Sequence, residues 1–466
     1  MTNAVVGARA HRSRNTRPAH VLAIVCAGMA LANLDLFIVN VALPSIARDF
    51  GNAALEDLSW VLNGYAIVYA ALLVFLGRLA ERYRRNNSFL LGIALFTAAS
   101  AACAAANSVE TLVAFRLVQA AGAALMTPTS LALLLACYPP EGRSGAVRIW
   151  TAIGGVAAAL GPVVGGLLLT LSWRWIFMVN VPIGLVGLLI GWWKLPEVPG
   201  HDVPRPDALG AVLVTTGVGA LTFGLVKTGD WGWHAPGVLA SIAVAAVLLI
   251  FFVVHCRHAN NPLVEPALFK VRTFTGGALV MAPFAMAFGA MLLSIVLWEQ
   301  GTWGWSALKS GLAIAPGPLL VPITSLTLAG RLIKRYGPAT VTSLGLVFFA
   351  GGCLWWATFV SLQPSYFMVV GGIVMTGIGV GFTLPTVMGA ASGALPPSSF
   401  ATGGGVINMI RQTGMAIGVA VLVAIVGTPG STTDRLAAFQ IAWWAMAAIT
   451  VGGLIPAVIM LRPKQA

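Results

Sequence analysis

The sequence has few charged residues for its length. Only 9% of its 466 residues are Asp, Glu, Lys or Arg, whereas a soluble globular chain carries about 25%. Apolar residues make up 58% of the chain, and the mean hydropathy is +0.89. These values exclude a soluble enzyme and a disordered protein, and they indicate a polytopic membrane protein in contact with a lipid bilayer.

Cysteine pairs and cofactor motifs are also missing. The five cysteines lie in or beside apolar runs and form no C-x-x-C pair, which excludes a disulfide framework and a zinc site. The sequence contains no Gly-Lys-Ser/Thr phosphate loop and no H-E-x-x-H motif, so neither an ATP-driven pump nor a membrane zinc hydrolase is indicated. We therefore expect no enzymatic activity, no metal and no cofactor.

Long apolar segments fill most of the chain. A membrane-spanning helix needs about 20 mostly apolar residues, and fourteen segments meet this requirement. We predict an all-α fold with an N-terminal six-helix bundle (1–195), a two-helix linker insert (196–256) and a C-terminal six-helix bundle (257–466). The segments are 20–47, 57–80, 88–107, 109–138, 143–171, 173–194, 207–227, 235–256, 273–301, 306–332, 338–359, 365–392, 399–427 and 434–461.

Lys and Arg are distributed unevenly between the two sides of these segments. With a cytoplasmic N-terminus, twenty of them fall in inner segments and five in outer ones, which is the asymmetry of a protein with both termini cytoplasmic. The same asymmetry explains the net charge of +13 without nucleic acid. The basic start and the A-x-A at 30–32 imitate a signal peptide. Because the apolar run continues to Ala47, we expect no cleavage there.

An internal repeat relates the two halves of the chain. Residues 77–83 read GRLAERY and residues 330–336 read GRLIKRY, with five of seven positions identical at an offset of 253. Such symmetry is typical of transporters, whose substrate site lies between the repeats near the middle of the membrane.

Six motifs occur in order on the predicted helices. Residues 34–44 read LDLFIVNVALP, 77–86 GRLAERYRRN, 116–122 RLVQAAG, 161–166 GPVVGG, 173–182 WRWIFMVNVP and 408–414 NMIRQTG. Together they resemble the fourteen-helix drug:proton antiporter branch of the major facilitator superfamily. Departures from the family pattern are Phe37 for Thr, Glu81 for Asp, Arg84 for Gly and Asn86 for Arg.

The resemblance implies a proton-coupled antiporter in the cell membrane. It would act as a monomer and export amphiphilic drugs, antibiotics or antiseptics. A dedicated exporter of one endogenous metabolite or self-made antibiotic stays open, because the motifs encode coupling and not selectivity.

Asp35 is the leading candidate for proton coupling. An aspartate at the centre of a spanning helix costs about 2.5–3.5 kcal/mol on the insertion scale, so such residues are usually functional. Arg116, inside the fourth segment, cannot lose its proton and is the natural partner. The alternative is a static ion pair. Glu299 is a possible second proton site or an attractor for cations, although its position near a helix end favours a solvated carboxylate.

Two further motifs are expected to control the conformation. By resemblance, Gly77, Glu81, Arg82 and Arg85 form a gate latch in which Glu81 meets the helix that starts near Ser398 and Ser399. The alternative is that these arginines only set the topology. The small residues of 157–166, which include Gly161, Pro162, Gly165 and Gly166, allow close helix packing, and the resemblance places them between the two bundles.

The substrate cavity should be lined from both halves by apolar and aromatic side chains with few polar anchors, as suits amphiphilic compounds. The predicted lining residues are Asn40, Asn63, Tyr65, Gln119, Met126, Phe284, Phe288, Trp298, Asn408, Arg411 and Gln412.

Overall fold

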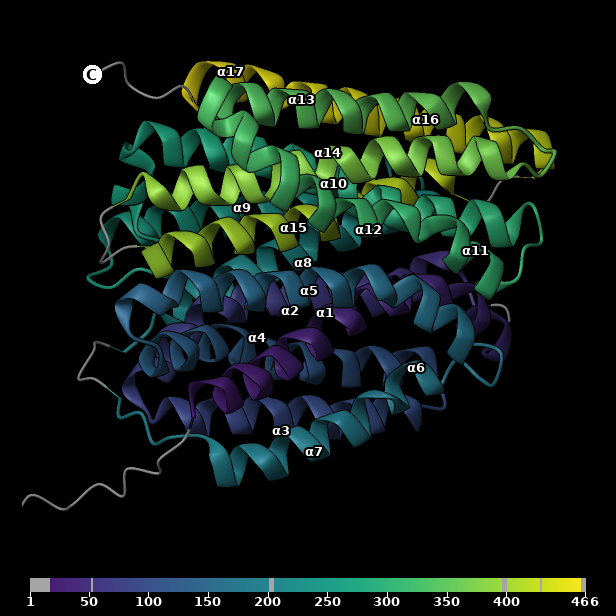
Figure 1. Cartoon of the computed structure of the whole chain (residues 1–466). Helices are drawn as coiled ribbons and strands as arrows, with labels where there is room; N and C mark the ends of the chain where they lie inside the picture. The colour runs from purple at the N-terminus through teal and green to yellow at the C-terminus, as the bar shows by residue number, and fades with distance from the viewer. Residues whose placement is uncertain (1–16, 52, 201–204, 396–399, 428–429, 462–466) are drawn as a thin grey trace, which may run out of the picture.

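The chain folds into a bundle of long, roughly parallel helices in a computed structural model (Figure 1). The structure describes residues 17–51, 53–200, 205–395, 400–427 and 430–461. Within these ranges every regular element is a helix, so the all-α prediction is confirmed for the described chain.

The first part of the chain forms α1 to α7. Their bounds are α1 Pro18–Asp49, α2 Leu55–Arg82, α3 Arg85–Ala104, α4 Val109–Cys137, α5 Pro140–Leu168, α6 Trp175–Met178 and α7 Asn180–Lys194. Two further helices, α8 (Ala208–Trp231) and α9 (Pro236–His258), pack against each other. α8 also contacts both α2 and α15, so this pair lies beside the seam between the two ends of the chain.

The last part of the chain forms the remaining helices. They are the 3₁₀ turn η1 Pro266–Lys270, α10 Arg272–Gly301, α11 Ala307–Ile314, α12 Pro316–Ile323, the π-helical segment η2 Thr324–Ala329, α13 Gly330–Phe359, α14 Tyr366–Gly393, α15 Phe400–Val426, α16 Thr432–Gly452 and α17 Leu454–Met460. In Figure 1 these green and yellow helices lie on one side of the bundle and α1 to α7 on the other. α1 begins and α17 ends at the same end of the bundle.

Among the described residues, twelve helices are long and apolar enough to cross a membrane. One of them, Ala307–Phe359, has 53 residues and is interrupted at Gly337, where φ is +80°. Only glycine adopts this backbone conformation readily. Pro338, which has no N–H, then starts the next helical run. α5 contributes only a shorter apolar helix, Ile153–Leu168.

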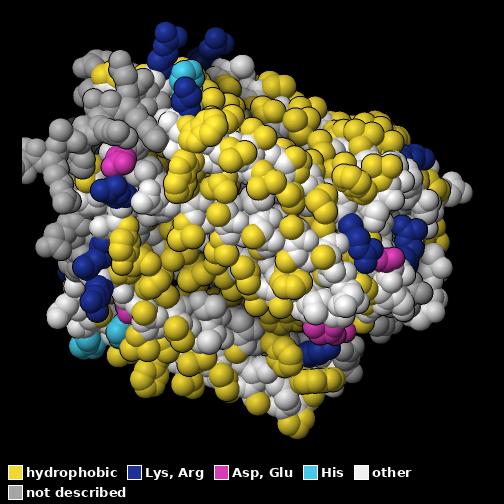
Figure 2. Space-filling view, turned by 90° about the horizontal axis from the view of Figure 1, so that it is seen from below, with side chains coloured by type: hydrophobic (Ala, Val, Ile, Leu, Met, Phe, Trp, Pro, Cys, Tyr) yellow, Lys and Arg dark blue, Asp and Glu magenta, His cyan; other side chains and the backbone are white. Residues whose placement is uncertain are grey.

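The surface matches this composition. Figure 2 shows a broad apolar band across one face, with most of the Lys, Arg, Asp and Glu side chains near its two ends. Large apolar side chains such as Ile190, Phe251 and Phe367 are exposed. A lipid-facing surface requires this arrangement, because charged side chains are costly in hydrocarbon.

The internal repeat extends from sequence into packing. α3 packs closely against α4, as α13 does against α14. Gly92 and Gly345 lie at corresponding positions in these pairs, 253 residues apart, and a Cβ on either would collide with the neighbouring helix. Both helix pairs therefore depend on backbones that approach closely.

A second glycine pair follows the same repeat. Gly161 and Gly165 of α5 face α1, whereas Gly414 and Gly418 of α15 face α10. The second pair follows the first at the same offset of 253 residues. In each half, then, the fifth long helix packs on the first through two glycines.

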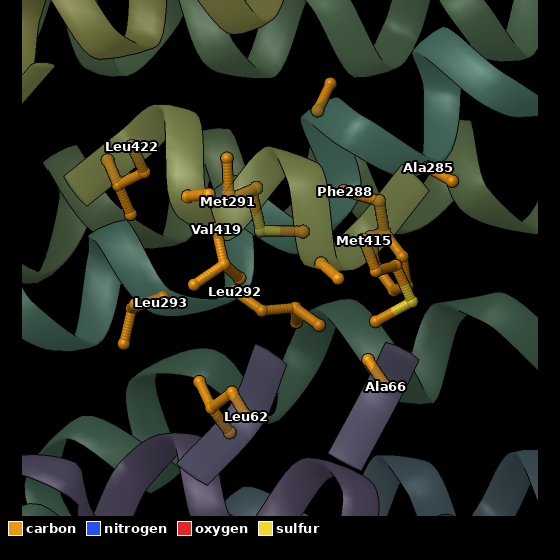
Figure 3. Close-up of a cluster of buried hydrophobic side chains, with 14 of the residues drawn as sticks. Leu62, Ala66, Ala285, Phe288, Met291, Leu292, Leu293, Met415, Val419 and Leu422 are labelled. Carbon is orange, nitrogen blue, oxygen red and sulfur yellow. The ribbon is translucent and has the colours of Figure 1, made fainter. Parts of the chain in front are cut away.

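Buried apolar side chains fill the seam between the two ends of the chain. Figure 3 shows Leu62 and Ala66 of α2 facing Leu292 of α10 and Met415 of α15. Gln300 of α10 also donates a hydrogen bond to the carbonyl of Val41 on α1, at 3.1 Å. The seam is tightly closed at this level of the bundle.

Candidate transport site

Asp35 lies in the middle of α1, and its carboxylate is completely buried. It accepts hydrogen bonds from Nη1 of Arg116 at 2.5 Å, from Nε2 of Gln119 at 2.9 Å and from Nδ2 of Asn180 at 3.1 Å. Three donors from two other helices therefore hold one ionised carboxylate. A buried charge is tolerated only with this kind of compensation.

Arg116 of α4 is compensated from several directions. In addition to the ion pair with Asp35, it donates to Oε1 of Gln119 at 2.6 Å and to the Val61 carbonyl at 3.2 Å. The Tyr65 ring lies 4.1 Å from the guanidinium carbon and adds a cation–π contact. Nη2 of Arg116 has no hydrogen-bond partner among the described residues. This guanidinium therefore has one nitrogen that a further acceptor could reach.

Ser100 and Asn180 complete the network, and sequence reasoning assigned neither of them a role. Ser100 of α3 accepts from Gln119 at 2.7 Å, and Asn180 begins α7 with its side chain directed to Asp35. Both side chains are fully buried. The sequence offers one signal for them, a polar residue inside an apolar segment, and many other residues share it. The four helices α1, α3, α4 and α7 thus meet at a single carboxylate.

A small cavity lies beside this network, in the seam. Its volume is about 30 Å³, which is room for a water molecule or two. The lining residues come from α1, α2, α4, α10 and α15, namely Leu36, Asn40, Leu62, Asn63, Ala66, Arg116, Gly289, Leu292, Met415, Ala416 and Val419. Asn63 is buried, and neither side-chain atom of its amide has a hydrogen-bond partner. A larger molecule requires the two sides of the seam to separate.

The other predicted cavity residues lie elsewhere in this conformation. Met126 is buried against Phe89 inside the α1–α4 core, and Trp298 packs edge-on against Trp443. Neither lines the cavity. Tyr65 and Gln119 support Arg116 instead.

Two phenylalanines of α10 lie close to the seam. Phe284 and Phe288 stack with ring centroids 6.0 Å apart. Phe288 also reaches Phe37 of α1, at 6.3 Å. Phe37, a departure from the family pattern, therefore makes an apolar contact across the seam where the family has a polar residue.

Glu299 near the end of α10 is not a solvated helix end. Its side chain is 0% exposed, so that interpretation is wrong. Neither carboxylate oxygen has a hydrogen-bond partner among the described residues, and Ser310 and Lys309 of α11 lie beside it. The segment after α10 folds back over this position, with the Trp305 amide donating to the Glu299 carbonyl at 3.0 Å. The sequence did not reveal this cover.

The small-residue motif of α5 has two faces. A Cβ on Gly161 would lie 2.8 Å from Cβ of Phe37, and one on Gly165 would lie 2.9 Å from Cγ1 of Ile38. These two glycines therefore pack against α1 of their own half, which corrects the expectation that they lie between the bundles. Gly166 does face the other half, since a Cβ there would be 2.6 Å from Cα of Leu308, and Gly311 approaches the Pro162 carbonyl.

The basic loop after α2 is fastened to neighbouring segments. Arg84 forms an ion pair with Glu197 at 2.9 Å, and the Arg85 amide donates to the Val198 carbonyl at 3.0 Å. Gly77 packs closely on Pro128 of α4. The side chain of Glu81 and residues 396–399 lie outside the described part of the chain, so the expected latch contact is not described. Arg82 has partners of its own.

The segment between α9 and α10 is held from two sides. Arg78 at the end of α2 donates to Oε1 of Glu265 at 2.6 Å and to the Pro262 carbonyl at 2.9 Å. Asp207, the N-cap of α8, contacts His255 and accepts from the Gly210 and Leu263 amides. Burial opposes ionisation of Asp207, but these hydrogen bonds outweigh it and lower the pKa of its carboxyl below the usual 3.8.

Comparisons with known proteins agree with this architecture. The family model described as Major Facilitator Superfamily matches residues 25–418 and 278–466. The chain is 30% identical to the "Tetracenomycin C resistance and export protein" of Streptomyces glaucescens, over 87% of this chain and 75% of that protein. It is 32% identical to the "Cephamycin export protein CmcT" of Amycolatopsis lactamdurans, over 91% of this chain and 88% of that one.

The fold is also similar to solved transporter structures. An autoinhibited POT-family peptide transporter superposes with a TM-score of 0.70 at 15% sequence identity, covering 96% of this chain and 98% of that one. At this identity the similarity concerns the fold alone.

Proposed function

The chain belongs to the major facilitator superfamily, and we propose that it is a proton-coupled antiporter that exports amphiphilic drugs, antibiotics or antiseptics. The observation that carries the proposal is the buried Asp35–Arg116 network beside a cavity in the seam. The names of two relatives, a resistance and export protein and an export protein, support it. Alternating access would then move the two halves about this cavity.

We also propose fourteen membrane crossings with both termini cytoplasmic. Twelve candidate spans are long and apolar enough, the 53-residue one is divided at Gly337, and α5 adds a further apolar helix. The halves are the six-helix bundles 1–195 and 257–466, with α8 and α9 as the insert. An even number of crossings agrees with α1 beginning and α17 ending at one end of the bundle (Figure 1). The protein then acts as a monomer in the cell membrane.

Proton coupling is assigned to the Asp35 carboxyl. When it is ionised, its charge neutralises Arg116, and three donors hold it in place. Protonation removes that charge, so the ion pair is lost and Arg116 is left as a buried cation without a counter-charge. The free energy of the network therefore depends on the proton, and the conformation that better solvates Arg116 becomes favoured.

The test is Asp35→Asn, with Asp434→Asn at an exposed helix start as the matched control. Asparagine preserves the shape but cannot take up a proton. We expect Asp35→Asn to lose proton-driven substrate export in proteoliposomes by at least about tenfold, on the scale of a lost charge-assisted interaction, while the control transports normally. Full gradient-driven export by Asp35→Asn would refute the coupling role.

Glu299 is proposed as a second proton site. Its carboxyl is buried, has no hydrogen-bond partner in the described part of the chain and lies near Lys309.

Glu81 is proposed to act in the gate latch, and Gly166 and Pro162 are proposed to seal the contact between α5 and α11.

A dedicated exporter of a single compound is the second candidate. The names of the cephamycin and tetracenomycin C exporters favour it. Export assays over a chemically diverse panel separate the two functions. Export of one scaffold alone supports the dedicated exporter, and export of unrelated scaffolds supports the multidrug function.

A further inference from the structure

A second arginine inside an apolar helix, Arg411, has no carboxylate beside it among the described residues, unlike Arg116. It lies near the middle of α15, a helix of 27 residues, and its Nε atom is buried without a hydrogen-bond partner. None of the described acidic side chains forms an ion pair with it. A guanidinium cannot lose its proton in a protein, so this position carries a permanent charge inside the bundle.

The neighbours of Arg411 are polar but uncharged. Tyr69 of α2 lies beside it and is also close to Asn408, and the Tyr69 hydroxyl donates to Thr127 at 3.1 Å. The adjacent Gln412 is 1% exposed, and neither atom of its amide group has a hydrogen-bond partner among the described residues. Among the described residues, the surroundings of Arg411 therefore hold a phenol and an amide, but no anion.

Position links this group to the cavity. Met415, one helical turn after Arg411, lines the cavity, as does Ala66, which is three residues before Tyr69 on α2. Residues three or four apart share a helix face, so Arg411 and Tyr69 lie on the two surfaces that border the cavity. They come from opposite sides of the seam.

We propose that Arg411 is the specificity-determining residue for the charged group of the substrate, and that the exported compounds are anionic amphiphiles with a carboxylate or comparable oxyanion. A partly buried guanidinium that has no protein anion beside it can bind an anion from a ligand, and Arg matches the planar carboxylate through two parallel hydrogen bonds. The aromatic pair Phe284 and Phe288 supplies an apolar surface near the same seam. This inference rests on the proposed export function.

The charge of the substrate determines how transport responds to membrane voltage. Whatever the number of protons exchanged per substrate, export of a monovalent anion moves two more positive charges inward than export of a monovalent cation. An inside-negative potential therefore accelerates export of an anion more than export of a cation.

The experiment uses the full-length protein in proteoliposomes with three matched naphthalene probes that carry a carboxylate, a carboxamide or a trimethylammonium group. We expect the wild type to export the carboxylate at least tenfold faster than the trimethylammonium compound, and faster still under an inside-negative potassium diffusion potential. Arg411→Gln should reduce carboxylate export to the rate of the carboxamide, and Arg411→Lys should recover part of it.

Arg257→Gln, at an exposed position near the end of α9, is the matched control. Export of the carboxamide by Arg411→Gln shows that this variant is folded and still coupled; if the variant does not fold, the wild-type charge preference and voltage response decide the question. An unchanged carboxylate preference in a folded Arg411→Gln, or a wild-type preference for the cation, overturns this inference and leaves the export function intact. If a proton gradient drives export of neither the probes nor any compound of the diverse panel, the proposed function is contradicted. This inference then fails with it.

Discussion

At the scale of single residues, the two intramembrane arginines differ in what surrounds them. Arg116 has a carboxylate, an amide oxygen, a carbonyl and a tyrosine ring. Arg411 has a phenol and two amides nearby and no carboxylate among the described residues. The first arrangement holds Arg116 beside a counter-charge on Asp35. The second arrangement leaves the guanidinium of Arg411 available to a ligand that enters the seam.

Glu299 gives a residue-scale prediction. Because its carboxyl is buried and has no hydrogen-bond partner among the described residues, Glu299→Gln keeps the shape of the side chain but removes the group that can take up a proton. We expect the variant to stay folded and to move fewer protons per substrate, measured as proton uptake against substrate flux in proteoliposomes. The matched control is Glu110→Gln, the same substitution at the start of α4. Gln300, the neighbour of Glu299, is unsuitable as a control position because it donates a hydrogen bond across the seam.

The same experiment has a contrary outcome. If Glu299 has only a structural role, Glu299→Gln changes thermal stability while the ratio of protons to substrate stays at the wild-type value. That result would remove Glu299 from the coupling scheme.

The residues of the site differ in how well the sequence predicts them. Asp35 and Arg116 stand out because a charge in an apolar segment is costly, and the structure brings them together. Ser100 and Asn180 carry no charge, and apolar segments contain many such residues that only bond their own helix, as Thr376 does. Their role depends on which helices meet, and hydropathy does not encode that.

At the scale of helices, close packing depends on glycines at a few positions. Gly161 and Gly165 allow α5 to approach α1, and Gly414 and Gly418 allow α15 to approach α10. The sequence indicated the small-residue stripe but not its partner, because the stripe alone does not specify which neighbour it meets. The resemblance placed the whole stripe between the bundles, while the structure divides it between two faces.

Gly161→Leu tests this packing. The new side chain would collide with Phe37 and Ile38, and overpacking of this kind costs about 1–3 kcal/mol. We expect a thermal midpoint several degrees below that of the wild type in detergent. Gly155→Leu, on the same helix and with open space around its Cα, should stay within a degree or two. Equal thermal midpoints for the two variants would show that α1 moves aside without a loss of stability.

Asp207 gives a pH-dependent prediction for the α8 helix start. Its folded pKa is lowered, so its stabilising effect is fully present above its ordinary value of 3.8 and is lost as the pH falls through the lowered folded value. Asp207→Ala should cost about 1 kcal/mol at pH 7, as for other N-caps. The difference in thermal midpoint between variant and wild type should shrink towards pH 3. A constant difference from pH 7 to pH 3 would contradict the ionic contribution.

At the scale of the whole molecule, transport requires the seam to open, because the cavity is too small for a drug-sized compound. Val74 of α2 and Gly405 of α15 face each other across the seam, with 3.6 Å between Cγ2 of Val74 and an ideal Cβ on Gly405. We expect the double variant Val74→Cys and Gly405→Cys to transport until it is oxidised, then to stop, and to recover with reductant.

The control for cross-linking is the wild type, whose described native cysteines are all free and separate. Its transport should not respond to the oxidant. Undiminished transport by the cross-linked double variant would show that this part of the seam does not move.

The sequence predicts the general architecture better than its details. Hydropathy identifies most of the spans, and the offset of 253 residues predicts two related halves. The division of the 53-residue helical run depends on a single glycine with positive φ and the proline after it. The cover over Glu299 depends on a tertiary contact, so no local pattern predicts it.

The two related halves have kept their packing but not their chemistry. At the repeat offset, Phe96 corresponds to Phe349, whereas Ser100, which contacts the proton network, corresponds to Cys353, which is buried among apolar side chains. The ion pair of Asp35 and Arg116 thus lies in the first half, while the Ser100 position of the second half is apolar. Under the proposed function, substitutions around Arg411 in the second half can change which compounds are recognised without altering the Asp35 network of the first half. A duplicated scaffold of this kind is a favourable starting point for rapid diversification of antibiotic resistance.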